Sequence, residues 1–281
     1  MGALSLSILL ALGASAAYGA ADYSGGIISK RTSSVGVVIL GHIFSLLILV
    51  PLAILMGEPL PTSSDMLFGM LAGLSGGFGL IILYRALAEG QMSIASPVSA
   101  LVAAALPVLV GLWIDGLPGL LMLTGFGLAL LAIWLMAASS SISLNHAWKQ
   151  LRLPLLSGIF FGLFFVGLNL ASGNGIIWPV AATRIGSIPG LLVYTSLVRL
   201  KWKPERKHWL AILFISLLDL VGNILFIASS QLSRLDLAAV ISSLYPGFTV
   251  ALAWLLLKER LTRSQWVGVA CALLALVLIS L

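Results

Sequence analysis

Residues 229–281 decide the fold class, and they read SSQLSRLDLAAVISSLYPGFTVALAWLLLKERLTRSQWVGVACALLALVLISL. An apolar segment that contains Pro246 leads into a short charged turn at 258–263, and a second apolar segment runs to the end of the sequence. About 20 apolar residues are enough for a helix to cross a bilayer. Residues 86–137 repeat this plan around a turn at Asp115-Gly116. The two stretches therefore predict two membrane-embedded helical hairpins.

The composition extends this prediction to the whole chain. Of its 281 residues, 60% are hydrophobic and only 9% are charged, whereas a soluble domain carries about 25% charged residues. So few charges cannot cover a water-exposed surface, and the sequence predicts an all-α, polytopic membrane protein with ten transmembrane helices in a lipid bilayer. The ten expected helices span 3–27, 34–56, 66–88, 92–114, 118–138, 153–173, 175–199, 208–230, 236–257 and 264–281.

The chain also resembles itself at a fixed offset, which indicates an internal repeat. A shift of 143 residues places Gly19 on Gly162 and Gly79 on Gly222 without gaps. The same shift also aligns Ser99 with Ser242, Gly125 with Gly268, and 129–132 with 272–275. We expect a first five-helix repeat at 1–138, a central linker at 139–152 and a second repeat at 153–281. Because five is odd, the second repeat enters the membrane in the opposite orientation, as in many secondary transporters.

The net charge of +6 arises from an excess of basic residues, and these lie mainly between the apolar segments. Basic residues at such places determine orientation in the membrane, so no nucleic-acid partner is expected. All but two lie on one side of the predicted topology; the exceptions are Arg234, on the other side, and Arg184, within a helix. The charge rule places both termini outside the cell, and we expect the protein to lie in the inner membrane.

The sequence contains no catalytic set. Cys271 is the single cysteine, and no His-x-x-x-His pair, Gly-x-Ser-x-Gly turn or carboxylate cluster is present. We therefore expect no enzyme activity, no metal site and no cofactor.

Four ionisable residues within the apolar segments are the coupling and ion-pair candidates, because burying a charge in hydrocarbon is costly. Arg184 and Asp219 lie on consecutive helices at depths that differ by roughly 3–4 Å, which predicts an ion pair. That pair either fixes the two helices or exchanges one partner for a substrate group or a proton. His42 is either a titrating group or a packed, hydrogen-bonded one. Asp22 is expected at the membrane edge, near Lys30.

Aromatic and polar side chains within the helices could form a small-molecule pocket. The run of glycines at 69–79 either provides a packing surface or a hinge. The substrate-binding candidates are Tyr18, Tyr84, Ser99, Asn169, Asp219, Asn223, Ser242 and Tyr245.

The closing hairpin resembles the drug/metabolite transporter superfamily and, within it, the ten-helix EamA-type exporters. The resemblance rests on 242–246 (SSLYP), 254–261 (WLLLKERL) and Gly268. The family usually has Gly where this chain has Lys258, and its Trp-Gly pair in the first helix is Tyr18-Gly19 here.

This resemblance implies export of a small metabolite, such as an amino acid or a related compound, by alternating access. It places the substrate candidates in a central cavity and Arg184 behind the cavity wall. Coupling to protons through Asp219 remains open, as do an uncoupled facilitator or exchanger and a non-transporting membrane partner subunit. A channel would need a continuous polar stripe, and no helix carries one.

Overall fold

The computed structural model describes residues 2–89, 92–138, 147–173, 175–257 and 262–280. These residues form helices and connecting turns, and no strand occurs among them. The helices are α1 (Ala3–Ser29), α2 (Ser34–Leu55), α3 (Ser63–Ala88), α4 (Met92–Ile114), α5 (Leu120–Ala138), α6 (Ala147–Leu170), α7 (Ile177–Leu197), α8 (Trp209–Leu232), α9 (Leu235–Ser242), α10 (Tyr245–Leu257) and α11 (Arg263–Ser280). A short 3₁₀ helix, Arg206–His208, precedes α8.

Six of these helices are long and apolar enough to cross a membrane, and two shorter apolar stretches lie in α5 and α11. The six spans lie in α1, α2, α3, α4, α6 and α8. Together they confirm the prediction of an all-α, polytopic membrane protein.

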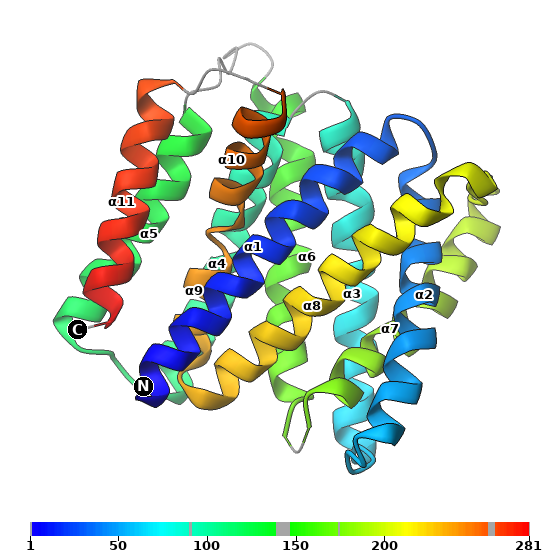
Figure 1. Cartoon of the computed structure of the whole chain (residues 1–281), viewed down its shortest axis with the longest axis horizontal. Coiled ribbons are helices and arrows are strands. Elements are labelled where there is room, and N and C mark those ends of the chain that lie inside the picture. Colours follow the sequence, from blue (N-terminus) through cyan, green and yellow to red (C-terminus); the bar gives the residue numbers. More distant parts are fainter. Residues whose placement is uncertain (1, 90–91, 139–146, 174, 258–261, 281) are drawn as a thin grey trace.

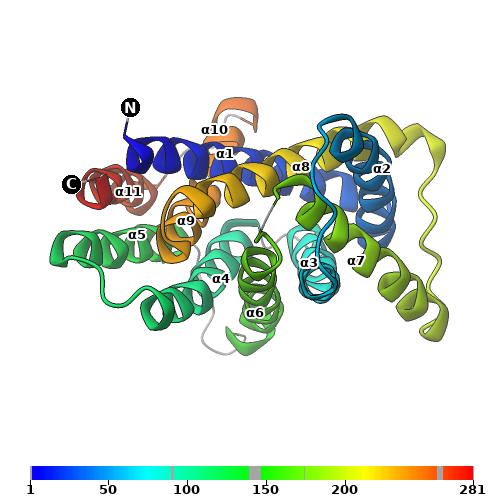
Figure 2. The same cartoon turned by 90° about the horizontal axis from the view of Figure 1, so that it is seen from below.

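The helices pack in pairs that join distant parts of the sequence. At one end of the molecule α5 packs on α11, and at the other end α2 packs on α7 (Figure 1). Between them α1 crosses α8, while α3 packs on α6. Seen from below, α3, α4 and α6 lie on one side of the molecule, and α1 and α8 lie on the other (Figure 2). This arrangement brings α1, α3, α6 and α8 together at the centre.

The predicted ninth helix, 236–257, is wrong as one continuous element. The chain forms α9 and α10, which are separated by Ser243 and Leu244. The physical reason is Pro246, which has no N–H to donate to the Ser242 carbonyl and whose ring collides with that carbonyl in a continuous helix. The helix therefore ends, and α10 restarts with the proline in its first turn.

The central linker at 139–152 stays a prediction, although the helix that follows it begins earlier than the expected residue 153. Residues 139–146 lie outside the described part of the chain, and α6 begins at Ala147. The segment 147–150 (AWKQ) contains good helix formers and extends the helix beyond its apolar run. The charged turn at 258–261, which carries part of the family resemblance, also lies outside the described residues.

The glycines of α3 let neighbouring helices approach closely, as expected for a packing surface. A Cβ atom at Gly73 would overlap the backbone of Thr183 on α7. Farther along α3, a Cβ atom at Gly79 would lie 3.0 Å from Phe161 Cδ1 on α6. At the crossing of α1 and α8, a Cβ atom at Gly222 would lie 2.6 Å from Tyr18 Cε1. An aromatic ring therefore packs on a glycine at both central crossings, α1 with α8 and α3 with α6.

Candidate functional site

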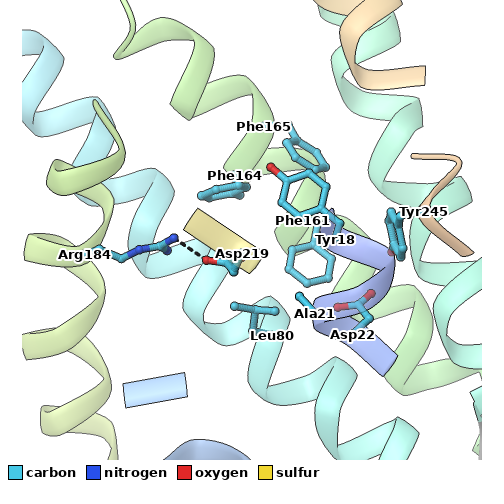
Figure 3. A pocket seen from close by; sticks show the side chains of 11 residues that line it. Tyr18, Ala21, Asp22, Leu80, Phe161, Phe164, Phe165, Arg184, Asp219 and Tyr245 are labelled. Atoms are coloured by element: carbon cyan, nitrogen blue, oxygen red, sulfur yellow. Dashed lines mark hydrogen bonds and ion pairs between the residues drawn. The ribbon is translucent and has the colours of Figure 1, made fainter. Parts of the chain in front are cut away.

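A cavity lies where α1, α3, α6, α7, α8 and α10 meet (Figure 3). The empty space between its lining atoms, which includes space open to solvent, amounts to about 500 Å³. Its lining residues are Tyr18, Ala21, Asp22, Gly76, Leu80, Phe161, Phe164, Phe165, Arg184, Asp219 and Tyr245. Most of this lining is apolar, and the charged groups are few.

Arg184 and Asp219 form the ion pair that the sequence predicts. Arg184 Nη2 lies 2.5 Å from Asp219 Oδ2, and the two side chains are only 2% and 14% exposed. The family resemblance placed Arg184 behind the cavity wall, but the residue contributes to the lining of the cavity itself. The dashed line in Figure 3 marks this pair at one end of the cavity.

His42 holds the other side of the Arg184 guanidinium. Arg184 Nη1 lies 3.2 Å from His42 Nε2, and His42 Nδ1 lies 2.7 Å from Ser187 Oγ. Because a guanidinium can only donate, Nε2 accepts, so the ring proton resides on Nδ1 and is donated to Ser187. His42 is therefore a neutral, hydrogen-bonded residue that orients Arg184 in this arrangement.

Asn223 continues the network from α8 to α1. Asn223 Nδ2 donates to Asp219 Oδ2 at 3.2 Å and to the Asp219 backbone carbonyl at 2.8 Å. Tyr18 Oη donates to Asn223 Oδ1 at 2.9 Å. An unbroken chain of polar contacts therefore runs from Ser187 through His42, Arg184, Asp219 and Asn223 to Tyr18.

Three of the eight predicted substrate residues line this cavity: Tyr18, Asp219 and Tyr245. Tyr84 instead lines a neighbouring cavity of about 240 Å³, together with His42 and Asp219. Asn223 lies within the polar network, completely buried.

The remaining three candidates have other roles. Ser99 donates to Ser157 Oγ at 3.1 Å in the contact between α4 and α6. Ser242 lies 3.5 Å from the Ala11 carbonyl, and Asn169 lies next to the end of α6. None of these three side chains lines the central cavity.

Asp22, which was expected at the membrane edge, lies inside the helix bundle. Its side chain lines the cavity, and the residue is 5% exposed. The reason is the length of α1, which continues to Ser29 and so leaves Asp22 roughly 10 Å from the helix end at ~1.5 Å per residue. Lys30 and Arg31 follow the end of that helix.

Sequence reasoning missed the aromatic lining of the cavity. Phe164 and Phe165 stand next to each other with ring centroids 5.5 Å apart, and Tyr18 lies 6.0 Å from Phe165. The repeat contains the signal that finds them. The offset of 143 residues places Ala21 on Phe164 and Asp22 on Phe165.

Polar contacts also tie together the connections at the lower edge of Figure 1, where both termini lie. The carboxylate of Glu58 accepts hydrogen bonds from the backbone N–H groups of Ile176, Ile177 and Trp178 at the start of α7. Negative charge is favourable at this end of a helix. The α2–α3 connection is therefore fixed to α7.

A second contact at this edge involves Arg234, which precedes α9. Arg234 donates to the carbonyls of Asp115 and Gly116, at 3.1 and 2.6 Å, and to the buried Asp236 carboxylate at 2.7 Å. Its hydrogen bonds to Asp236 raise the pKa of the Arg234 guanidinium above its usual value. The α4–α5 and α8–α9 connections are thereby held together.

No group of three or more His, Cys, Asp or Glu side chains that could hold a metal ion occurs within the described ranges. The charged groups of the cavity are one arginine and two aspartates. This set can bind a polar solute or a proton.

Comparisons with known proteins identify the group to which this chain is related. Residues 148–281 match the model of the EamA-like transporter family. An uncharacterized protein of Methanocaldococcus jannaschii is 26% identical over 135 residues, which make up 46% of this chain and 94% of that relative. A solved structure, described only as the crystal structure of a protein, has the same fold, with a TM-score of 0.73, 14% identity, and coverage of 98% of this chain and 96% of its own. The match over residues 148–281 therefore makes the second half of this chain similar to the EamA-like transporter family, in agreement with the resemblance of its closing hairpin.

Proposed function

We propose that this chain is a secondary transporter that exports a small polar or amphipathic metabolite, such as an amino acid or a related compound, by alternating access. The observation that carries the proposal is the composition of the cavity wall. The offset of 143 residues pairs Tyr18 with Phe161, Asp22 with Phe165, and Gly76 with Asp219. All six residues line the same cavity.

Two inverted five-helix repeats would produce such a cavity on their shared pseudo-twofold axis. The helix contacts support the duplication. Exchanging each helix for its counterpart turns the α1–α8 pair into the α6–α3 pair, and both pairs occur. The contacts between residues follow the same correspondence. Tyr18 lies against Gly222, and their counterparts Phe161 and Gly79 also lie against each other. In Figure 1, α1 begins at the edge where α6 ends, as opposite orientations require.

The size of a relative adds independent support for two halves. The matched region of the Methanocaldococcus jannaschii protein is 135 residues long and makes up nearly all of that protein. One five-helix repeat of this chain has about the same length. A single repeat therefore resembles a protein that exists by itself.

For the orientation, we propose the inner membrane with both termini outside. The basic residues of the α1–α2 and α7–α8 connections lie at the edge opposite the termini, and they include Lys30, Arg31, Lys201, Lys203, Arg206 and Lys207. Such residues favour the cytosolic side. An impermeant amine-reactive label that modifies these lysines in intact cells would contradict this orientation.

For the coupling, we propose that Asp219 takes up a proton. Protonation of Asp219 would neutralise the carboxylate that Arg184 binds, and the guanidinium could then contact a substrate. The gain of one proton by Asp219 is enough to weaken its contact with Arg184, because the attraction between two buried charges is strong. The same step would loosen the contact between α7 and α8.

The experiment is solute counterflow in proteoliposomes with a pool of labelled amino acids and metabolites, with and without a pH gradient. We expect uptake of one compound that rises with the gradient and is lost in Asp219→Asn. Glu89→Gln is the matched control, because Glu89 pairs with Arg85 on the exposed end of α3. Uptake that changes neither with the pH gradient nor with the Asp219→Asn substitution would indicate an uncoupled facilitator. Absence of uptake for the entire pool would contradict transport of these compounds and favour a membrane partner subunit.

A further inference from the structure

Asp22 carries a buried carboxylate that the polar network does not use. The residue is 5% exposed and lines the cavity. Within the described parts of the chain, its side chain makes no hydrogen bond and no ion pair. An ionised carboxylate that is buried without a partner is unfavourable, so such a group takes up either a proton or a positively charged partner. The cavity wall therefore offers a site for which a proton and a cationic group of a solute can compete.

The charge balance of the cavity leads to the same conclusion. Its lining contains two carboxylates, Asp22 and Asp219, and one cation, Arg184. Arg184 binds Asp219 at 2.5 Å and is therefore engaged. With both carboxylates ionised, one negative charge remains uncompensated, and Asp22 is the residue that holds it.

The wall from α6 supplies the second half of a recognition site. Phe161, Phe164 and Phe165 line the same cavity as Asp22, and Figure 3 shows their rings above it. Tyr245, from α10, stands beside the carboxylate in the same view. Aromatic faces attract organic cations and also bury apolar groups. The cavity therefore offers one charged contact and a large apolar surface.

We propose that the substrate is an organic amine with an apolar or aromatic body, whose ammonium group binds the Asp22 carboxylate while its body packs on the phenylalanines of α6. This assignment rests on the proposed transport function, because it names the substrate class of the same cavity. Neither an anionic nor an uncharged solute would compensate Asp22. A cationic group would form a charge-assisted hydrogen bond there.

The test uses three probes of nearly equal shape: phenethylamine, 2-phenylethanol and 3-phenylpropionate. Binding to the purified full chain is followed by the shift of its thermal unfolding temperature at neutral pH, at rising probe concentrations. We expect phenethylamine to bind about tenfold more tightly than the alcohol, as the loss of one charge-assisted contact predicts. The acid should bind most weakly, because its carboxylate meets another one.

Asp22→Asn keeps the shape of the side chain and removes its charge. In this variant we expect the amine to lose its advantage, about tenfold in affinity, while binding of the alcohol is unchanged. Asp22→Glu restores the charge and should restore the preference for the amine. Glu89→Gln, at the exposed end of α3, should behave as the native chain does.

Equal binding of the amine and the alcohol to the native chain would overturn the assignment, as would an unaltered preference in Asp22→Asn or binding of none of the three probes. The counterflow experiment distinguishes this failure from failure of the transport function. Counterflow of neutral or anionic solutes without an amine preference would support the transport function and contradict the amine site. An amine preference without any counterflow would support the amine site and contradict the transport function.

Discussion

The two central helix crossings share one contact, an aromatic ring packed on a glycine, and differ in the polarity of the residues around it. At the polar crossing, α1 against α8, the ring of Tyr18 lies on Gly222, and Asp22, Asp219 and Asn223 stand nearby. At the apolar crossing, α6 against α3, the equivalent positions hold Phe161, Gly79, Phe165, Gly76 and Leu80. The difference shows that glycine and ring size determine how the helices approach. The polar groups are an addition to one crossing only, and they are not needed to bring the helices together.

Breaking the ion pair of the polar crossing should have the largest effect on stability. Arg184→Ala leaves Asp219 buried without its cation, which should lower the free energy of unfolding by about 3–5 kcal/mol. The readout is equilibrium unfolding in detergent, followed by tryptophan fluorescence. The double variant Arg184→Ala/Asp219→Ala should lose clearly less than the sum of the two single losses. Strict additivity would show that the two residues are not coupled.

The second-largest effect is expected when a methyl group is added at the two equivalent glycines, because the loss of stability should differ between the two crossings. Gly222→Ala places a Cβ atom 2.6 Å from Tyr18 Cε1, while Gly79→Ala places one 3.0 Å from Phe161 Cδ1. Overpacking costs about 1–3 kcal/mol, so we expect Gly222→Ala to destabilise more than Gly79→Ala. Thermal unfolding of both variants checks the order. A larger loss at Gly79 would contradict the tighter approach at the polar crossing.

Exchanging the two rings tests the chemistry alone. Tyr18→Phe removes the hydrogen bond to Asn223 Oδ1, which should lower stability by about 1 kcal/mol. Phe161→Tyr does not create the equivalent bond, because Leu80 stands where Asn223 would be. We therefore expect both changes to destabilise the chain in thermal unfolding. A stabilising Phe161→Tyr would mean that the apolar crossing contains a hydrogen-bond partner for the new hydroxyl group.

The smallest expected effect has the opposite sign. Asp22→Asn removes a buried charge that has no partner among the described residues, so we expect a gain of about 1 kcal/mol in stability together with the loss of the amine preference. The measurement is the unfolding temperature without any added solute. Lower stability in Asp22→Asn would indicate that the carboxylate is held by the protein itself.

The sequence predicts the helices and the ion pair because both depend on local properties. Hydropathy determines where a helix can cross the membrane, and depth along two consecutive helices brings Arg184 level with Asp219. The inward position of Asp22 depends on the rotation and length of α1, which hydropathy does not encode. The break at Ser243 and Leu244 depends on a proline whose effect varies with its surroundings, since Pro97 and Pro107 lie within an unbroken α4. The phenylalanines of the cavity lining could have been predicted from the repeat, because Phe164 and Phe165 are the counterparts of Ala21 and Asp22.

The most direct test of alternating access through this cavity uses a single cysteine in its wall. Cys271, the one cysteine of the chain, is replaced by serine, and Ala21→Cys places a thiol among the lining residues at a position that is 2% exposed. A membrane-impermeant thiol reagent is then added from either side of oriented proteoliposomes. Alternating access predicts labelling from both sides and slower labelling when the solute identified by counterflow is present. Labelling from one side only, at a rate that the solute does not change, would contradict it.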